Sequence, residues 1–284
     1  MILHISHNDL DGVTCGVLTK KFIRDVDNIF CNYNEIDDIL LNVDTTAYAE
    51  ILITDMSPSQ KAFQQVMGDI QIIVIDHHES SKWLVGMTET SHDIKKCATL
   101  LTYEWLKQSG YDVSAYKELV ECVNDFDMWQ LKRKDSLQMN MLFMKLGVER
   151  YLERFSRRPF TGFTDDEQLI VDLETERRDK YIHAAAKSGF ALKDPDDLDV
   201  FVVFAEEYSS ELGNYIIKEL EMDYVVIINM QRKKVSLRSR QEVDIRLLAE
   251  QNGGGGHKNA AGFSFDFDFG IMDFLRECGV IDEG

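Results

Sequence analysis

Aspartate and histidine residues follow three short apolar segments in the first third of the chain. SHNDLDG begins at the end of the apolar segment 2–5, TDMS follows residues 51–53, and DHH follows the four aliphatic residues 72–75. Clustered carboxylates repel one another unless a cation neutralises them. A mixture of carboxylate and imidazole ligands favours manganese, magnesium, iron or zinc. The residue types and their positions therefore predict a metal site.

A later NDFD segment on an expected helix adds two further aspartates to this set. An extended HxDxD segment would point its three polar side chains to one face. A single aspartate at a strand end more often caps the following helix, but three such ends, two of them with histidine, indicate a shared site. So many carboxylates suit two ions with a bridging aspartate, about 3.5 to 4 Å apart. The candidate residues are His7, Asp9, Asp11, Asp55, Asp76, His77, His78 and Asp125, with Asp127 interpreted as a surface residue or a cap.

The elements that position these residues alternate between short apolar runs and amphipathic stretches. Residues 2–5, 51–53 and 72–75 are typical of buried strands, and residues 13–23 are typical of a helix. Ser57 and Pro58 are expected to begin another helix. Strands that alternate with helices predict a parallel sheet, and ligands of such sheets gather outside the carboxyl ends of the strands. The candidate side chains are therefore expected at one edge of the sheet.

After the first sheet, the chain is expected to be helical up to residue 189 and then to contain both strands and a helix. Residues 96–123 and 135–189 have the apolar spacing of helices, and the proline-containing acidic stretch KDPDDLD predicts a linker. Strands are expected at 200–204, 224–228 and 234–238, with a helix over 211–220. We therefore predict an α/β protein with an N-terminal parallel-sheet domain (1–130), a helical connector (131–193) and a smaller C-terminal α/β domain (194–284).

A second candidate site lies in SLRSR at 236–240 and NGGGGHKNAAGF at 252–263. Glycine backbone N–H groups can approach a phosphate closely, and a guanidinium binds phosphate with two hydrogen bonds. A glycine run alone is more often a flexible turn, but adjacent basic residues favour phosphate binding here. The expected substrate-binding residues are Arg238, Arg240, Gly254, Gly255, Gly256 and His257. The alternating Phe263, Phe265, Phe267 and Phe269 predict the core face of a sheet rather than a base-stacking surface.

Composition limits the classes of function. The chain has 284 residues, of which 44% are hydrophobic and 29% charged, and its net charge is −19. It contains no apolar run long enough for a membrane span, and Asp9 and Asp11 interrupt any signal-like segment at the N-terminus. The negative charge opposes coating of duplex nucleic acid. Five widely spaced cysteines without a CxxC pair favour reduced thiols. We therefore expect a cytoplasmic protein with neither membrane nor duplex as its partner.

Six motifs together resemble those of a known enzyme family. SHNDLDG, TDMS, IDHH and VNDFD, followed by SLRSR and GGGGHKNAAGF, resemble the DHH phosphoesterase superfamily with its C-terminal DHH-associated domain, in the oligoribonuclease and RecJ-like exonuclease branch. The resemblance spans most of the chain. It implies two manganese ions, or magnesium, with Asp55 as the bridge. The implied ligands are His7, Asp9, Asp11, Asp55, His77 and Asp125. Many relatives have the first histidine two positions earlier, where this chain has Ile5, so both His7 and His4 stay open as the first imidazole ligand.

The resemblance also implies roles for the remaining candidates. Asp76 is expected to orient an imidazole, and His78 to touch the scissile phosphate. Arg238 and the loop from Gly254 to His257 are expected to grip the phosphate or terminal nucleotide across a cleft between the domains. The predicted catalytic residues are thus His78, Asp76, Arg238 and His257.

The predicted reaction is two-metal hydrolysis of short oligonucleotides to mononucleotides. 3′-Phosphoadenosine 5′-phosphate is a further expected substrate. The partner is a short single-stranded oligonucleotide or a small nucleotide, and a homodimer stays open. The alternatives are a cyclic-dinucleotide phosphodiesterase, a single-strand DNA exonuclease, a pyrophosphatase and a non-catalytic nucleotide sensor.

Overall fold

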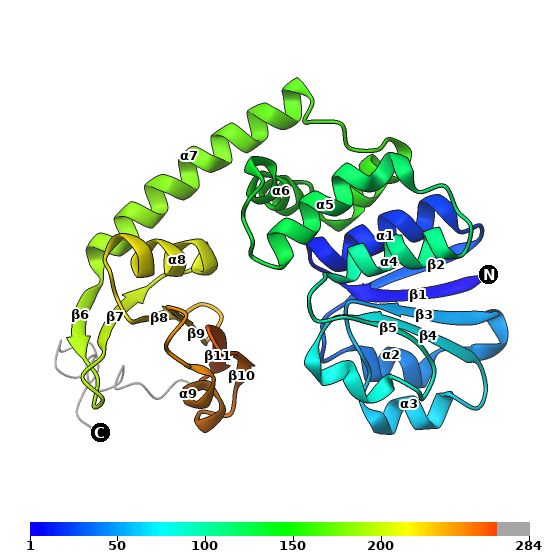
Figure 1. Cartoon of the computed structure of the whole chain (residues 1–284), viewed down its shortest axis with the longest axis horizontal. Helices are drawn as coiled ribbons and strands as arrows, with labels where there is room; N and C mark the ends of the chain where they lie inside the picture. The colour runs from blue at the N-terminus through cyan, green and yellow to red at the C-terminus, as the bar shows by residue number, and fades with distance from the viewer. Residues whose placement is uncertain (266–284) are drawn as a thin grey trace, which may run out of the picture. The chain divides into compact units, whose positions relative to one another are not determined.

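The computed structural model describes residues 1–265 (Figure 1). The chain divides into two compact units, Met1–Thr175 and Glu176–Gly284. The division falls within helix α7 (Asp165–Ser188). The domain boundaries expected after residues 130 and 193 stay a prediction.

The first unit contains a five-stranded parallel sheet, which confirms the expected fold. The strand order is β2-β1-β3-β4-β5. From β1 the chain passes to β2 at one edge and then returns to β3 on the other side of β1. Ligands of open parallel sheets bind at such a reversal point, outside the carboxyl ends of the two strands. The strands are β1 (Ile2–His7), β2 (Val26–Cys31), β3 (Glu50–Thr54), β4 (Gln71–Asp76) and β5 (Glu89–His92).

Helices cover both faces of this sheet (Figure 1). Helices α1 (Leu10–Phe22) and α4 (Ala98–Gln108) lie on one face, and α2 (Ile36–Asn42) and α3 (Gln60–Val66) lie on the other. Alternate strand residues enter two separate apolar clusters: Leu52 and Ile73 belong to one, and Ile51, Ile53, Ile72 and Val74 belong to the other. Two covered faces explain why the strands are continuous aliphatic runs rather than alternating ones.

The predicted helical regions are confirmed, with breaks that the apolar spacing did not define. Helix α5 (Lys117–Asp127) follows α4, and α6 (Lys134–Arg157) ends before α7 begins. Gly147 kinks α6 with a φ of 72°. The expected start of α3 at Ser57 and Pro58 is wrong, because the helix begins at Gln60. Ser59 caps it by accepting a hydrogen bond from the Ala62 N–H at 3.2 Å.

The second unit contains a six-stranded mixed sheet in the order β10-β11-β9-β8-β7-β6. The three expected strands and the expected helix α8 (Ser209–Glu219) are confirmed. The second half of the glycine run is a strand rather than a loop, because residues 255–257 form β10 and pair with β11. Phe263 and Phe265 pack against the core, while Phe267 and Phe269 lie outside the described residues. The other elements are β6 (Phe190–Lys193), β7 (Asp199–Phe204), β8 (Tyr224–Asn229), β9 (Lys234–Ser239), α9 (Arg246–Gln251), β10 (Gly255–His257) and β11 (Ala260–Ser264).

Over residues 1–265, none of the helices combines the length and the apolar character that crossing a membrane requires.

Candidate metal centre

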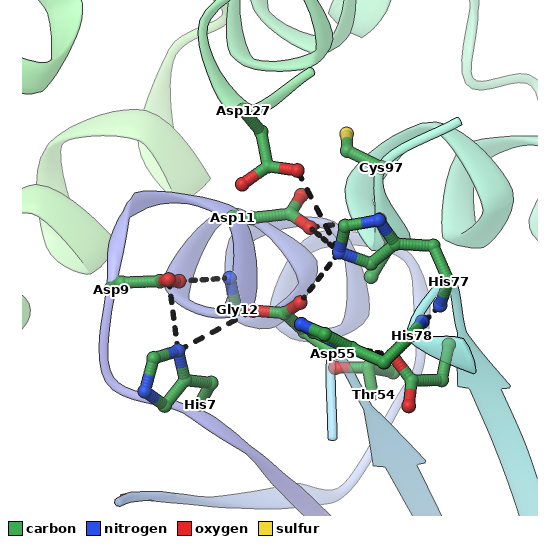
Figure 2. A network of polar contacts seen from close by, with 12 residues as sticks. His7, Asp9, Asp11, Gly12, Thr54, Asp55, His77, His78, Cys97 and Asp127 are labelled. Carbon is green, nitrogen blue, oxygen red and sulfur yellow. Dashed lines mark hydrogen bonds and ion pairs between the residues drawn. The ribbon is translucent and has the colours of Figure 1, made fainter. Parts of the chain in front are cut away.

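Acidic and imidazole side chains meet at the carboxyl ends of β1, β3 and β4 (Figure 2). They form three overlapping groups, and within each group the potential ligand atoms lie within 4.8 Å of one another. Asp55 and His77 each belong to two groups, so the groups form one continuous centre. The groups are His7, Asp9 and Asp55; Asp55, Asp76, His77 and His78; and Asp11, His77 and Asp127.

The HxDxD segment is not extended, so the expected alternation of its side chains is wrong. Strand β1 ends at His7, Asp9 is the N-cap of α1, and Asp11 lies in the first turn of that helix. Asp9 Oδ1 accepts the Gly12 N–H at 3.0 Å, and Asp9 Oδ2 lies 2.8 Å from His7 Nδ1. A Cβ atom on Gly12 would collide with the backbone of His7, so this tight strand-to-helix turn requires glycine. Asp9 therefore both caps the helix and faces the centre.

Asp11 is fixed at the N-terminus of a second helix. Its two carboxylate oxygens accept the backbone N–H groups of Ala98 and Thr99, at 2.8 Å and 2.8 Å. Exposed helix N–H groups stabilise an anion at this position. The side chain is fully buried, and Oδ2 lies 3.8 Å from His77 Nε2. Asp11 thus joins α1 and α4 with its charge directed at the centre.

Asp55 lies between the imidazoles of His7 and His77. Its Oδ1 is 3.3 Å from His77 Nε2, and its Oδ2 is 3.7 Å from His7 Nδ1. The residue has a φ of 59°, a left-handed conformation that costs free energy outside glycine and therefore indicates a constrained position. Burial, and then the nearby charges of Asp9 and Asp11, raise the pKa of Asp55 well above its usual value.

The DHH segment presents its two histidines differently. Asp76 Oδ1 accepts the His77 N–H and the ring Nδ1–H of His78, both at 2.7 Å, so Asp76 orients His78 rather than His77. Burial acts to lower the pKa of His78, but the hydrogen bond and charge of Asp76 outweigh it and raise that pKa. Burial lowers the pKa of His77, which favours the neutral imidazole that binds metals.

Two sequence candidates lie outside the centre. Asp125 points its oxygens at the backbone N–H groups of Lys132 and Arg133, each at 3.0 Å, and belongs to none of the three groups. His4 is buried inside the unit, where its ring contacts Asn28 and Thr54. Burial lowers the pKa of His4 to about 4. His7, rather than His4, therefore faces the carboxylates.

Asp127 occupies the place that was expected for Asp125. Its Oδ2 lies 3.6 Å from His77 Nε2. Burial, and then Asp11 and Asp9, raise the pKa of Asp127 well above its usual value. The helical period gave no signal for this choice, because Asp127 stands seven residues after the buried Val120 but Asp125 is buried as well.

The centre has the chemistry of a divalent metal site. Among the described residues, Asp55, Asp76 and Asp127 each have one buried carboxylate oxygen without a hydrogen-bond partner. A buried, unpaired carboxylate oxygen costs several kcal/mol unless a cation or donor compensates it. Imidazole and carboxylate together are typical ligands of manganese, magnesium, iron and zinc. The residues therefore fit bound metal ions.

The second candidate site is built mainly from internal contacts. The half-buried Arg238 donates to the Leu237 carbonyl at 2.8 Å and to Ser210 Oγ at 2.9 Å. Arg240 follows β9 and pairs with Asp223, its Nη2 lying 2.5 Å from Asp223 Oδ1. Burial lowers the pKa of Arg238. Both arginines thus already have partners within their own unit.

The glycine residues approach their own hairpin closely. A Cβ atom on Gly254 would collide with Phe263, and one on Gly256 would collide with the backbone of Ala261. His257, at the end of β10, is exposed. The substrate-binding roles of Arg238, Arg240 and Gly254–His257 stay predictions, as does an active site between the domains.

Comparisons with known proteins define the family. Residues 200–276 match the model of the DHHA1 domain. The chain is 30% identical to oligoribonuclease NrnB of Bacillus subtilis over 291 residues, which cover 91% of this chain and 71% of the relative. The chain belongs to the DHH phosphoesterase superfamily. A DHH phosphoesterase hydrolyses phosphoric ester bonds with the help of metal ions, and the acidic centre is compatible with that requirement.

Other members of the DHH superfamily are more distant. A 3′,5′-cyclic-nucleotide phosphodiesterase of Helicobacter pylori is 24% identical over 93% of both chains. The structure of the pGpG-specific phosphodiesterase PggH of Vibrio cholerae has a TM-score of 0.61 at 14% identity and covers 99% of this chain and 98% of that one. A DHH domain described as a member of the s1p family of ribosomal proteins has a TM-score of 0.64 at 15% identity, covering 98% and 85%. These structures confirm the fold.

Proposed function

We propose that this DHH phosphoesterase degrades short oligonucleotides from one end to mononucleotides with two manganese ions. The observation that supports this most directly is the position of Asp55, whose two oxygens face different imidazoles of the centre. A carboxylate so placed is suited to bridge two ions. The similarity to oligoribonuclease NrnB over 91% of the chain favours short RNA as the substrate.

We assign the ligands in two sets that share Asp55. His7 and Asp9 form the first set with Asp55, and Asp11, His77 and Asp127 form the second. Asp127 replaces Asp125 in this proposal, because the oxygens of Asp125 already bond backbone N–H groups. When bound, the metal ions lower the pKa of a coordinated water from 15.7 to about 7 and thereby supply hydroxide at neutral pH.

The side chains around the centre hold and orient the substrate phosphate. Asp76 accepts the Nδ1–H of His78 and so fixes the ring, which leaves Nε2, 3.2 Å from the Tyr33 hydroxyl, as the nitrogen for contact with a phosphate oxygen. The two backbone N–H groups of α4 that donate to Asp11 hold that carboxylate in place as charge develops during the reaction. Arg238 and His257 hold the phosphate or terminal nucleotide in this proposal.

The charge of the chain supports a short substrate. A net charge of −19 opposes binding of a long polyanion, and the local positive charge of bound metal ions would offset that repulsion for only a few nucleotides. 3′-Phosphoadenosine 5′-phosphate has the same phosphoester chemistry and is a further proposed substrate. We also infer a cytoplasmic location, where short RNA fragments arise.

The test is a time course with 5′-labelled RNA dinucleotides to pentanucleotides and Mn²⁺. Parallel reactions contain 3′-phosphoadenosine 5′-phosphate, cyclic dinucleotide, pyrophosphate and short single-stranded DNA. Stepwise shortening of RNA to mononucleotides is the expected result, and the ladder of products gives the direction. Faster turnover of cyclic dinucleotide than of any linear RNA would contradict the proposal and favour the alternative of a cyclic-dinucleotide phosphodiesterase. Tight nucleotide binding without any cleavage would indicate a sensor.

A further inference from the structure

Tyr33 stands at the edge of the metal centre on a constrained turn between β2 and α2. The Asn32 backbone N–H and side-chain amide both donate to Glu35 Oε2, at 2.7 and 2.8 Å. The Glu35 N–H returns a hydrogen bond to the Asn32 carbonyl at 3.0 Å. Since β2 pairs with β1 so that Cys31 is opposite His7, this turn lies at the same sheet edge as the centre.

The Tyr33 side chain contacts the imidazoles at the ends of two different strands. Its ring stacks on His7, with centroids 4.3 Å apart and planes at 29°. It meets His78 edge-on, with centroids 5.7 Å apart and planes at 80°. The Tyr33 hydroxyl lies 3.2 Å from His78 Nε2. Tyr33 thus joins an imidazole at the end of β1 with one at the end of β4.

A role in folding does not account for this position. Tyr33 is 50% exposed and belongs to none of the apolar core clusters formed by residues 1–265. An exposed tyrosine contributes little to the stability of a core. Its polar and ring contacts are instead directed at two histidines of the centre.

The hydrogen bonds of His78 define what Tyr33 does to it. Asp76 accepts the Nδ1–H of His78 on one side of the ring. On the other side the Tyr33 hydroxyl is within hydrogen-bond distance of Nε2, and a hydroxyl can donate to a neutral ring or accept from a protonated one. His78 is therefore held from both sides, by Asp76 at Nδ1 and by Tyr33 at Nε2, and its ring orientation is set before substrate arrives.

We propose that Tyr33 is a positioning residue that orients two histidines of the centre, His7 through ring stacking and His78 through its hydroxyl. For His78 this inference rests on the proposed function, in which that histidine touches the scissile phosphate. Removal of a residue that orients a metal ligand typically costs 10–100-fold in metal affinity or activity. The hydroxyl contact with His78 and the ring contact with His7 can be removed one after the other, so the effect on metal affinity can be measured apart from the effect on activity.

The test compares Tyr33→Phe and Tyr33→Ala with Tyr48→Phe. Tyr48 offers a matched control, because its hydroxyl also bonds one acceptor, Asp27 Oδ2 at 3.2 Å, but lies just before β3 and thus at the opposite end of the sheet. We measure kcat and KM for an RNA dinucleotide, and separately the Kd of Mn²⁺ for metal-free protein by calorimetry without nucleotide. The thermal midpoint of each variant confirms folding.

Tyr33→Phe keeps the ring on His7 and loses the hydroxyl, so kcat falls about tenfold while KM and the Mn²⁺ Kd stay within about twofold. Tyr33→Ala also loses the stacking, so the Mn²⁺ Kd rises about tenfold. Tyr48→Phe changes neither quantity. Wild-type values of kcat and Kd in both Tyr33 variants would overturn the proposal, and so would a change in KM alone. Calorimetry needs no substrate, so failure of the wild type to cleave RNA would refute the proposed function while the Kd comparison still tests Tyr33.

Discussion

The metal centre of the first unit and the arginine and glycine residues of the second differ in how well their polar groups are satisfied. In the centre, Asp55 is buried and Asp127 is partly buried, each has an oxygen without a hydrogen bond, and each pKa is raised by burial and neighbouring carboxylates. In the second unit, Arg240 pairs with Asp223 and Arg238 bonds Ser210. The carboxylates of the metal centre lack partners that would offset their charge, whereas the two arginines of the second unit have such partners within that unit. A ligand should therefore change the first region more than the second.

The largest expected effect follows from Asp55→Asn. Asparagine keeps the size and tolerates the positive φ, but it removes the charge that faces both His7 and His77. We expect kcat/KM for an RNA dinucleotide to fall at least about 1,000-fold, a loss of about 4 kcal/mol in transition-state stabilisation. Steady-state kinetics with saturating Mn²⁺ measure it. Activity above about a tenth of wild type would show that Asp55 does not hold the metal ions.

The second largest expected effect is the loss of activity in Asp127→Asn, and Asp125→Asn on the same helix is its matched control. We expect Asp127→Asn to lower kcat about 100-fold, because its oxygen faces His77, and not to lower the thermal midpoint of the metal-free protein, because the raised pKa of Asp127 makes its charge unfavourable there. Asp125→Asn weakens two hydrogen bonds to backbone N–H groups, so it should lower the free energy of unfolding by about 1 to 3 kcal/mol and leave kcat within about threefold. Kinetics and thermal unfolding of both variants measure these changes. The reverse pattern would restore Asp125 as the ligand.

The pH dependence of stability sharpens the comparison further. A raised pKa in the folded state means that the contribution of Asp55 to stability is present at low pH and is lost as pH rises through that pKa. Without metal, Asp55→Asn should therefore have a higher thermal midpoint than wild type at pH 8, and the difference should shrink as the pH falls toward 4. Unfolding curves of both proteins in a chelator measure it. A difference that grows toward low pH would contradict the raised pKa.

The smallest expected effect on activity belongs to the second unit. Arg240 is half exposed, but its partner Asp223 is buried and, among the described residues, keeps only the Asp199 N–H as a donor to its side chain when the guanidinium is removed. We expect Arg240→Gln to change KM for the dinucleotide by less than about threefold and to lower the free energy of unfolding by about 1 to 3 kcal/mol. Arg238→Gln serves as the comparison, with an expected rise in KM of about tenfold, or about 1.4 kcal/mol. A tenfold effect at Arg240 would show that its pairing with Asp223 gives way to substrate.

Part of this structure could be predicted because its signals are local. The aliphatic runs in β3 and β4 identify strands covered on both faces, and the polar residues directly after them must lie at the carboxyl edge. β2 and β5 were not located, because their partly exposed, polar-containing sequences lack a strong strand pattern. The last two glycines of the run belong to β10, because pairing with β11 outweighs the low strand propensity of glycine.

The residue types that form the site could be predicted from the sequence. Which of them point toward the centre was harder to predict. The HxDxD pattern suits a strand as well as a capped helix start, and only the close approach of Gly12 to His7 favours the helix. On α5 burial does not separate Asp125 from Asp127; the difference is that Asp125 binds backbone N–H groups from the segment that follows the helix while Asp127 faces His77. Tyr33 gave no signal, because its contacts with His7 and His78 join residues far apart in sequence.

The central claim is that one continuous centre holds two metal ions around Asp55. Calorimetric titration of metal-free protein with Mn²⁺, for wild type and Asp55→Asn in parallel, tests it most directly. The account predicts two ions per chain in the wild type and a Kd at least about tenfold higher for both sites in the variant. Binding of no ion to wild type, or the same two sites at unchanged affinity in Asp55→Asn, would contradict it.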